Sequence, residues 1–111
     1  MTTITQVQLV APVQLSNADA AMYNAPTSTT AKIGRAVFTN TTASAVTITA
    51  GISPGGALGV LQMISARTVA PGESYVSPEL AGAVLPANSA IRAFASAAAS
   101  ITFTASGLII Q

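Results

Sequence analysis

Apolar and polar residues alternate along much of this chain, and that period of two constrains its fold more than any other feature. Residues 46–52 read VTITAGI and residues 101–105 read ITFTA, so apolar side chains fall on every second position. This spacing places one face of a β-strand on a core and the other face outside it. Less regular strands are predicted at residues 2–10, 32–39, 60–69, 74–76 and 90–96.

Turn sequences separate these predicted strands. Residues 53–56 (SPGG) and 70–73 (APGE) place Pro where φ near −65° is needed and Gly where φ must be positive, as type II turns require. Further breaks are predicted at residues 40–42 and 85–88. Strands at short intervals without a long helical period indicate an all-β fold, an antiparallel β-sandwich that is jelly-roll-like. The three alanines at 97–99 could favour a helix, but the alternation on both sides favours a tight connection.

The first part of the chain differs from the rest. Residues 2–10 alternate like a strand, whereas residues 11–30 are punctuated by Pro and Asn. We expect an extended N-terminal arm or first strand at residues 1–18 and a β-sandwich domain at residues 19–111. An arm of this kind could pair with a sheet edge on a neighbouring subunit, or the segment could be the first strand of its own sheet.

Charged side chains are scarce. Only 6% of the 111 residues are charged, where about 25% is usual for a soluble domain. A freely diffusing protein normally carries charges of both signs on its surface to resist association. The composition therefore predicts a subunit that works packed against other chains. The seven charged residues are Asp19, Lys32, Arg35, Arg67, Glu73, Glu79 and Arg92.

The residue inventory argues against several function classes. The chain has no His and no Cys, which removes the commonest proton-transfer group and all thiolate chemistry. Glu73 and Glu79 could in principle act as a carboxylate pair, but their turn-like setting favours solvated surface charges. We therefore predict no enzyme activity, no cofactor, no metal site and no small-molecule substrate. A net charge of +1 without clustered cations predicts no nucleic-acid binding, and no apolar run predicts a membrane span or a signal peptide.

Three arginines and two tyrosines are the candidate contact residues. Arginine is common at interface hot spots, and in a nearly uncharged chain each one is conspicuous. The alternative is that the arginines are solvated on outer sheet faces or pair with acidic residues of the same chain. The tyrosines could anchor loops to their own core or contact a partner. These candidates are Arg35, Arg67, Arg92, Tyr23 and Tyr75.

Residues 21–26 (AMYNAP), 36–42 (AVFTNTT) and 64–75 (ISARTVAPGESY) together resemble small β-sandwich virion proteins of tailed bacteriophages. The chain is most similar to the capsid-decorating (cement or stapling) proteins of short-tailed phages of the epsilon-fifteen type, over about residues 20–110. The resemblance implies a jelly-roll-like subunit on the outer capsid surface of the virion, assembled in the host cytoplasm. Its implied partners are the major capsid protein and copies of itself, and its implied role is to staple neighbouring capsid subunits.

A second interpretation is a tail or fibre module that binds a host-surface carbohydrate or another virion protein. Sugar-binding platforms typically use aromatic rings, and this chain has no Trp and two Tyr. The composition therefore favours the capsid role over carbohydrate binding.

Overall fold

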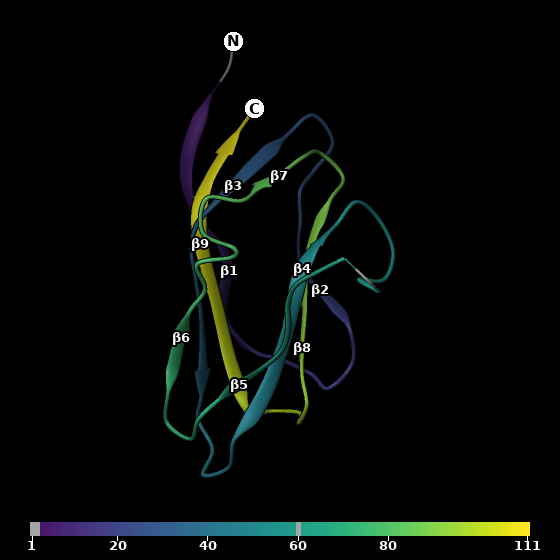
Figure 1. The fold of residues 1–111 in the computed structure, drawn as a ribbon. Coiled ribbons are helices and arrows are strands. Elements are labelled where there is room, and N and C mark those ends of the chain that lie inside the picture. The colour runs from purple at the N-terminus through teal and green to yellow at the C-terminus, as the bar shows by residue number, and fades with distance from the viewer. Residues whose placement is uncertain (1–2, 60) are drawn as a thin grey trace.

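The computed structural model describes residues 3–59 and 61–111, and these residues form two antiparallel β-sheets packed face to face (Figure 1). One sheet has the strand order β1-β9-β3-β6, with β7 also paired to β3. The other has the order β2-β8-β4-β5. The five-stranded sheet comprises β1 (Ile4–Gln14), β9 (Ile101–Ile110), β3 (Thr30–Asn40), β6 (Ser74–Val76) and β7 (Val84–Leu85). The four-stranded sheet comprises β2 (Ala20–Asn24), β8 (Ala90–Ala95), β4 (Val46–Ser53) and β5 (Gln62–Val69).

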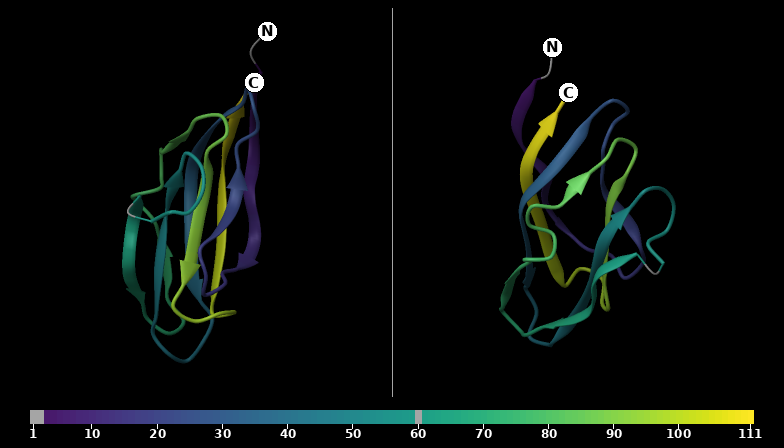
Figure 2. Two further views of the ribbon diagram at one scale, coloured as in Figure 1. Left: turned by 90° about the vertical axis from the view of Figure 1, so that its right-hand side faces the viewer. Right: turned by 45° about the horizontal axis from the view of Figure 1, so that its top comes forward.

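Most connections cross from one sheet to the other. The chain stays in one sheet only between β4 and β5 and between β6 and β7, and it crosses at every other step. Figure 2 shows the resulting two layers and the elongated shape, which measures 49 × 25 × 20 Å. The two packed sheets confirm the predicted all-β, antiparallel β-sandwich, and its jelly-roll-like winding stays a prediction.

The core is made of small aliphatic side chains around one aromatic pair. Phe38 of β3 and Phe103 of β9 are fully buried, and their ring centroids lie 4.5 Å apart. Alternation along β9 explains this placement, because residues 101, 103 and 105 are buried while the threonines between them are half-buried. The other large, fully buried apolar side chains are Leu15, Ile33, Ile48, Leu58, Val69, Leu80, Leu85, Ile91 and Ile101.

The N-terminal segment pairs within its own chain. β1 runs antiparallel to β9, with Ile4 opposite Ile110 and Gln14 opposite Thr102. Leu9 and its neighbour Val10 are both buried in the core, because a register shift between Val7 and Val10 lets two consecutive residues face inward. Of the two alternatives left open by the sequence, residues 4–14 therefore form a first strand of the sandwich. The division of the chain at residue 18 stays a prediction.

The strand predictions need three corrections. The loose segment predicted at residues 11–30 contains the end of β1 and all of β2, because pairing with β9 and β8 continues through residues that do not alternate. β7 was not predicted, because its two residues lie in the short stretch between Gly82 and Pro86 and form a strand only by pairing with β3. β9 extends to Ile110, beyond the clean alternation. Met1, Thr2 and Val60 lie outside the described residues. Thr2 and Val60 are the first residues of the strands predicted at 2–10 and 60–69.

The turn at 70–73 follows the sequence, whereas the type II turn predicted at 53–56 is wrong, because positive φ falls on Gly56 (71°) and not on Gly55. In the 70–73 turn Gly72 has φ 72°, and the Glu73 N–H donates to the Ala70 carbonyl over 3.0 Å. These are the features of a type II turn. Residues 97–99 lie in a turn that joins β8 to β9, and not in a helix.

Candidate interaction surfaces

Arg92 is engaged within the chain. It lies on β8, and its Nε donates to the Asp19 carboxylate over 2.9 Å. The other oxygen of Asp19 accepts the backbone N–H of Leu58 over 2.7 Å. These bonds, that of Leu58 first and then that of Arg92, hold the pKa of Asp19 below its usual value. Asp19 therefore ties the backbone at Leu58 to the four-stranded sheet, and Arg92 helps to hold Asp19 in place.

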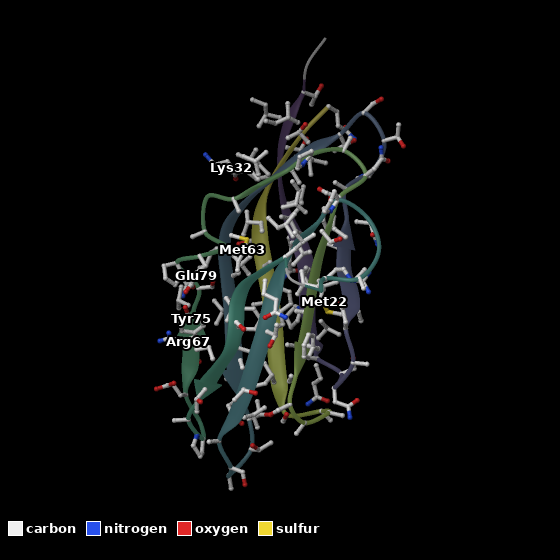
Figure 3. All side chains as sticks on the ribbon, turned by 45° about the vertical axis from the view of Figure 1, so that its right-hand side comes forward. Met22, Lys32, Met63, Arg67, Tyr75 and Glu79 are labelled. Carbon is white, nitrogen blue, oxygen red and sulfur yellow. The ribbon has the colours of Figure 1, made fainter. Side chains whose placement is uncertain are left out.

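Arg67 also has a partner within its own chain. It lies on β5, at the edge of the four-stranded sheet opposite β2. Its guanidinium carbon lies 4.1 Å from the centroid of the Tyr75 ring, and the Tyr75 hydroxyl donates to Glu79. Figure 3 shows Arg67, Tyr75 and Glu79 next to one another along one edge of the sandwich. Burial and the Glu79 carboxylate raise the pKa of Tyr75, while the Tyr75 hydroxyl lowers that of Glu79. Because Arg67 lies on β5 and Tyr75 on β6, this cluster closes the seam between the two sheets.

Glu73 and Tyr23 are likewise tied to their own chain. The Glu73 carboxylate accepts the Ala70 N–H over 3.3 Å within its turn. Tyr23 is half-buried on β2 and packs against the core, and its burial raises its pKa. Together with the contacts of Arg67, Arg92 and Tyr75, these observations favour the intramolecular alternatives for four of the five candidate residues. A partner contact by any of the five stays a prediction.

Lys32 and Arg35 lie in a different setting, on β3 in the five-stranded sheet. Both are exposed, and no carboxylate of residues 3–59 or 61–111 lies within salt-bridge distance of either. The register of β3 shifts at Gly34, where Ile33 pairs with Gly107 and Arg35 pairs with Ser106. Lys32 points outward by alternation with the buried Ala31 and Ile33, and the bulge turns Arg35 to the same side. Figure 3 shows the Lys32 side chain pointing away from the sandwich.

A shallow depression of about 510 Å³ lies beside these cations. Its floor includes Gly34 and Gly107, which carry no side chain to fill it. Gly107 is required there, because a Cβ at that position would lie 1.9 Å from the Lys32 carbonyl oxygen. The depression has no aromatic or charged lining. Its lining residues are Gln6, Val7, Gln8, Gly34, Ser106, Gly107 and Leu108.

Apolar side chains share this face of the sheet with the two cations. Lys32 is paired with Val84 on one side and Leu108 on the other, and residues opposite each other in a sheet share a face. Val84 is 54% exposed and Val76, opposite Val37, is 49% exposed. We call the outer side of the five-stranded sheet, defined by Lys32, Arg35, Val76, Val84, Leu108 and the depression, the basic face. None of the five strands contains Asp or Glu.

The strand edges, by contrast, are protected against pairing. β1 has two register shifts and contains Pro12, which cannot donate a backbone hydrogen bond. On β5, Ala66 has φ 49° and donates its N–H to the Thr49 hydroxyl, and Arg67 is turned towards Tyr75. Bulges and inward-turned charges are the devices that keep sheet edges from adding strands. Broad contact with a partner is therefore more accessible through the basic face than through these edges.

Sequence reasoning did not identify Lys32 or the exposed valines as surface features. The isolated Gly34 between Lys32 and Arg35 was the available signal, because glycine inside a strand often marks a bulge. Among the described residues no group of three or more His, Cys, Asp or Glu side chains could hold a metal ion. The described part of the chain also has no helix long and apolar enough to cross a membrane.

No family model matches the sequence, and no curated protein is similar to it in sequence. Three solved structures of infectious bursal disease virus are similar in fold. The T13 viral particle gives a TM-score of 0.60 at 11% identity, over 98% of this chain and 30% of that chain. The Gx strain gives 0.58 at 14% identity, over 98% and 32%. The VP2 subviral particle gives 0.57 at 16% identity, again over 98% and 32%.

This similarity shows the fold. The chain has a β-sandwich of the kind found in proteins of a viral particle, and it spans about a third of the length of those chains. Nearly the whole chain takes part in the superposition, so the likeness concerns the complete sandwich and not one sheet.

Proposed function

We propose that this chain is a structural virion protein that decorates the outside of a bacteriophage capsid and staples neighbouring major capsid subunits. The observation that carries the proposal is the likeness of 98% of the chain to the sandwich of viral-particle proteins. The resemblance of residues 21–26, 36–42 and 64–75 to phage decorating proteins is the reason for proposing a bacteriophage capsid and a position on its outer surface. Assembly in the host cytoplasm and contact with further copies of itself belong to the same proposal.

The distribution of charge supports this role. The chain exposes 5501 Å² with seven charged residues. Two of them, Asp19 and Arg92, form an ion pair, and Arg67 and Glu79 each contact Tyr75 inside the subunit. A surface with so few free charges is suited to burial against other chains. Many copies that each bury a modest neutral surface across a joint between subunits would resist opening together, because multivalent attachment strengthens individually weak contacts.

The tail or fibre interpretation has less support. The depression on the basic face is lined by glutamine, glycine, serine and aliphatic residues, and no ring is present to stack on a sugar.

Quantitative mass spectrometry of purified virions tests the proposal. We expect many copies of the chain per particle, and a particle reconstruction should place them on the outside of the head. Heads that lack the chain should release their contents at lower temperature than complete heads. A handful of copies per particle, or a location confined to the tail, would reject the capsid role.

A further inference from the structure

The carboxylates of the described chain are all engaged internally. Asp19 binds Arg92 and the Leu58 N–H, Glu79 accepts the Tyr75 hydroxyl, and Glu73 accepts a backbone N–H in its own turn. The two arginines of the four-stranded sheet are held by this network. No acidic side chain within residues 3–59 and 61–111 is left to neutralise the basic face.

The cations of the basic face are arranged for an external partner. The bulge at Gly34 places Lys32 and Arg35 on the same side of β3, next to a depression whose floor is backbone. Gln6 and Ser106 on its rim offer polar groups that can bond a carboxylate or a peptide group. Val76 and Val84 flank the cations with exposed apolar surface.

We propose that the basic face docks an acidic segment of a different protein, whose carboxylates contact Lys32 and Arg35 and whose apolar side chains cover Val76 and Val84. Only the identity of that protein as a capsid subunit rests on the proposed function. β1, β9 and β3, with ten or eleven residues each, and the short β6 and β7 beside them present roughly 600 Å², about three quarters of one partner's share of a standard interface.

Charge complementarity selects this occupant over the others. A nucleic acid requires more cations than two, because its affinity depends on neutralising many phosphates. A second copy of this chain could offer only Asp19, Glu73 and Glu79, and each of these carboxylates already accepts a hydrogen bond within its own chain. An acidic protein segment needs only two cations and also gains from the exposed valines.

A titration followed by amide NMR tests the inference on the intact chain. The probe is a short blocked peptide of alternating glutamate and valine, and its glutamine counterpart is the control. We expect the glutamate peptide to shift the amide resonances of Gly34, Ser106, Gly107 and Leu108. The double variant K32Q/R35Q should weaken binding about tenfold, because each unit of 1.4 kcal/mol is a factor of ten and two exposed ion pairs of under 1 kcal/mol each are removed.

Matched variants separate charge from structure. K32R/R35K keeps both charges and should retain most of the binding, whereas R67Q removes a cation from the opposite edge and should leave it unchanged. Shifts that map to β2 or β5, equal binding of the glutamine peptide, or tighter binding of oligothymidylate or of phosphatidylglycerol vesicles would overturn the inference. Concentration-dependent dimerisation that K32Q/R35Q abolishes would overturn it in favour of a second copy.

Cosedimentation with virion heads distinguishes this inference from the proposed function. If the wild-type chain attaches to heads and K32Q/R35Q attaches equally well, the basic face is not the docking surface, and the capsid role stands. If the chain attaches to no head but binds the glutamate peptide as described, the capsid role fails, and the assignment of the basic face stands.

Discussion

In the four-stranded sheet each arginine contacts another part of the same chain, whereas the five-stranded sheet carries two cations that contact no carboxylate of the described residues. Arg92 binds Asp19 and Arg67 lies over Tyr75, so both contribute to the fold. Arg35 has the same side chain as Arg67 and Arg92 and differs from them in its surroundings, as Lys32 does. The comparison teaches that the sheet that carries a cation decides whether its own chain supplies a contact.

The largest expected effect comes from breaking the five-stranded sheet itself. Gly107→Ala would place a Cβ against the Lys32 carbonyl and force β9 away from β3, so we expect a loss of about 3 kcal/mol in the free energy of unfolding. Gly34→Ala is the matched control, because its Cβ would meet nothing closer than 3.4 Å. Urea unfolding checks both. Equal stability of the two variants would contradict the close approach.

Removing one charge from each sheet tests whether charged side chains stabilise the two sheets to different extents. Asp19→Asn weakens the bonds to Arg92 and Leu58, and we expect it to cost about 1 to 2 kcal/mol. Arg35→Gln should change stability by no more than about 0.5 kcal/mol, since it removes no internal contact. The same unfolding measurement applies. A loss in Arg35→Gln as large as that in Asp19→Asn would show that the basic face also stabilises the fold.

The pH dependence should follow the paired charges alone. In the folded chain the pKa of Asp19 lies below 3.8 and that of Glu79 lies below 4.5. Each group therefore stabilises the fold fully above its usual pKa, and this stabilisation is lost as the pH falls through the lowered folded-state pKa. We expect stability to decline below about pH 4, with a shallower decline in Asp19→Asn and an unchanged decline in K32Q/R35Q. Unfolding midpoints measured from pH 2 to pH 7 would reveal a contrary pattern.

The smallest effect is expected at the seam. Arg67→Gln removes the cation over the Tyr75 ring and should cost about 0.5 kcal/mol, the usual value for an exposed cation–π contact. Tyr75→Phe keeps the ring but loses the hydroxyl bond to Glu79. The double variant should cost less than the sum of the two single variants if both side chains act as one cluster. Strict additivity in thermal unfolding would argue against the cluster.

The sequence predicted those strands whose alternation is regular. β4 and β9 were located from their rows of apolar residues, and the turn at 70–73 from its Pro and Gly. β2 was missed because AAMYN carries no such row and is held by its pairing with β8. The continuation of β1 was missed because Pro12 and two register shifts interrupt the alternation.

The candidate site was less predictable than the fold. Asp19 and Arg92 are 73 residues apart, and only the register of β2 against β8 brings them together. The outward direction of Arg35 depends on the bulge at Gly34, which a strict period of two does not describe. The local sequence pattern therefore indicated which segments are strands. Which charged side chains find a partner depended on long-range pairing between strands.

The central place of β9 has a consequence for biosynthesis. This strand lies between β1 and β3, and it follows every other strand along the chain. While a ribosome is still making residues 101–110, β1 has no neighbour to pair with, although β4, β5 and β8 can already meet. Long-range closure of this kind is slow compared with local hairpins. The nascent chain would therefore complete the five-stranded sheet, and with it the basic face, only after residues 101–110 have been made.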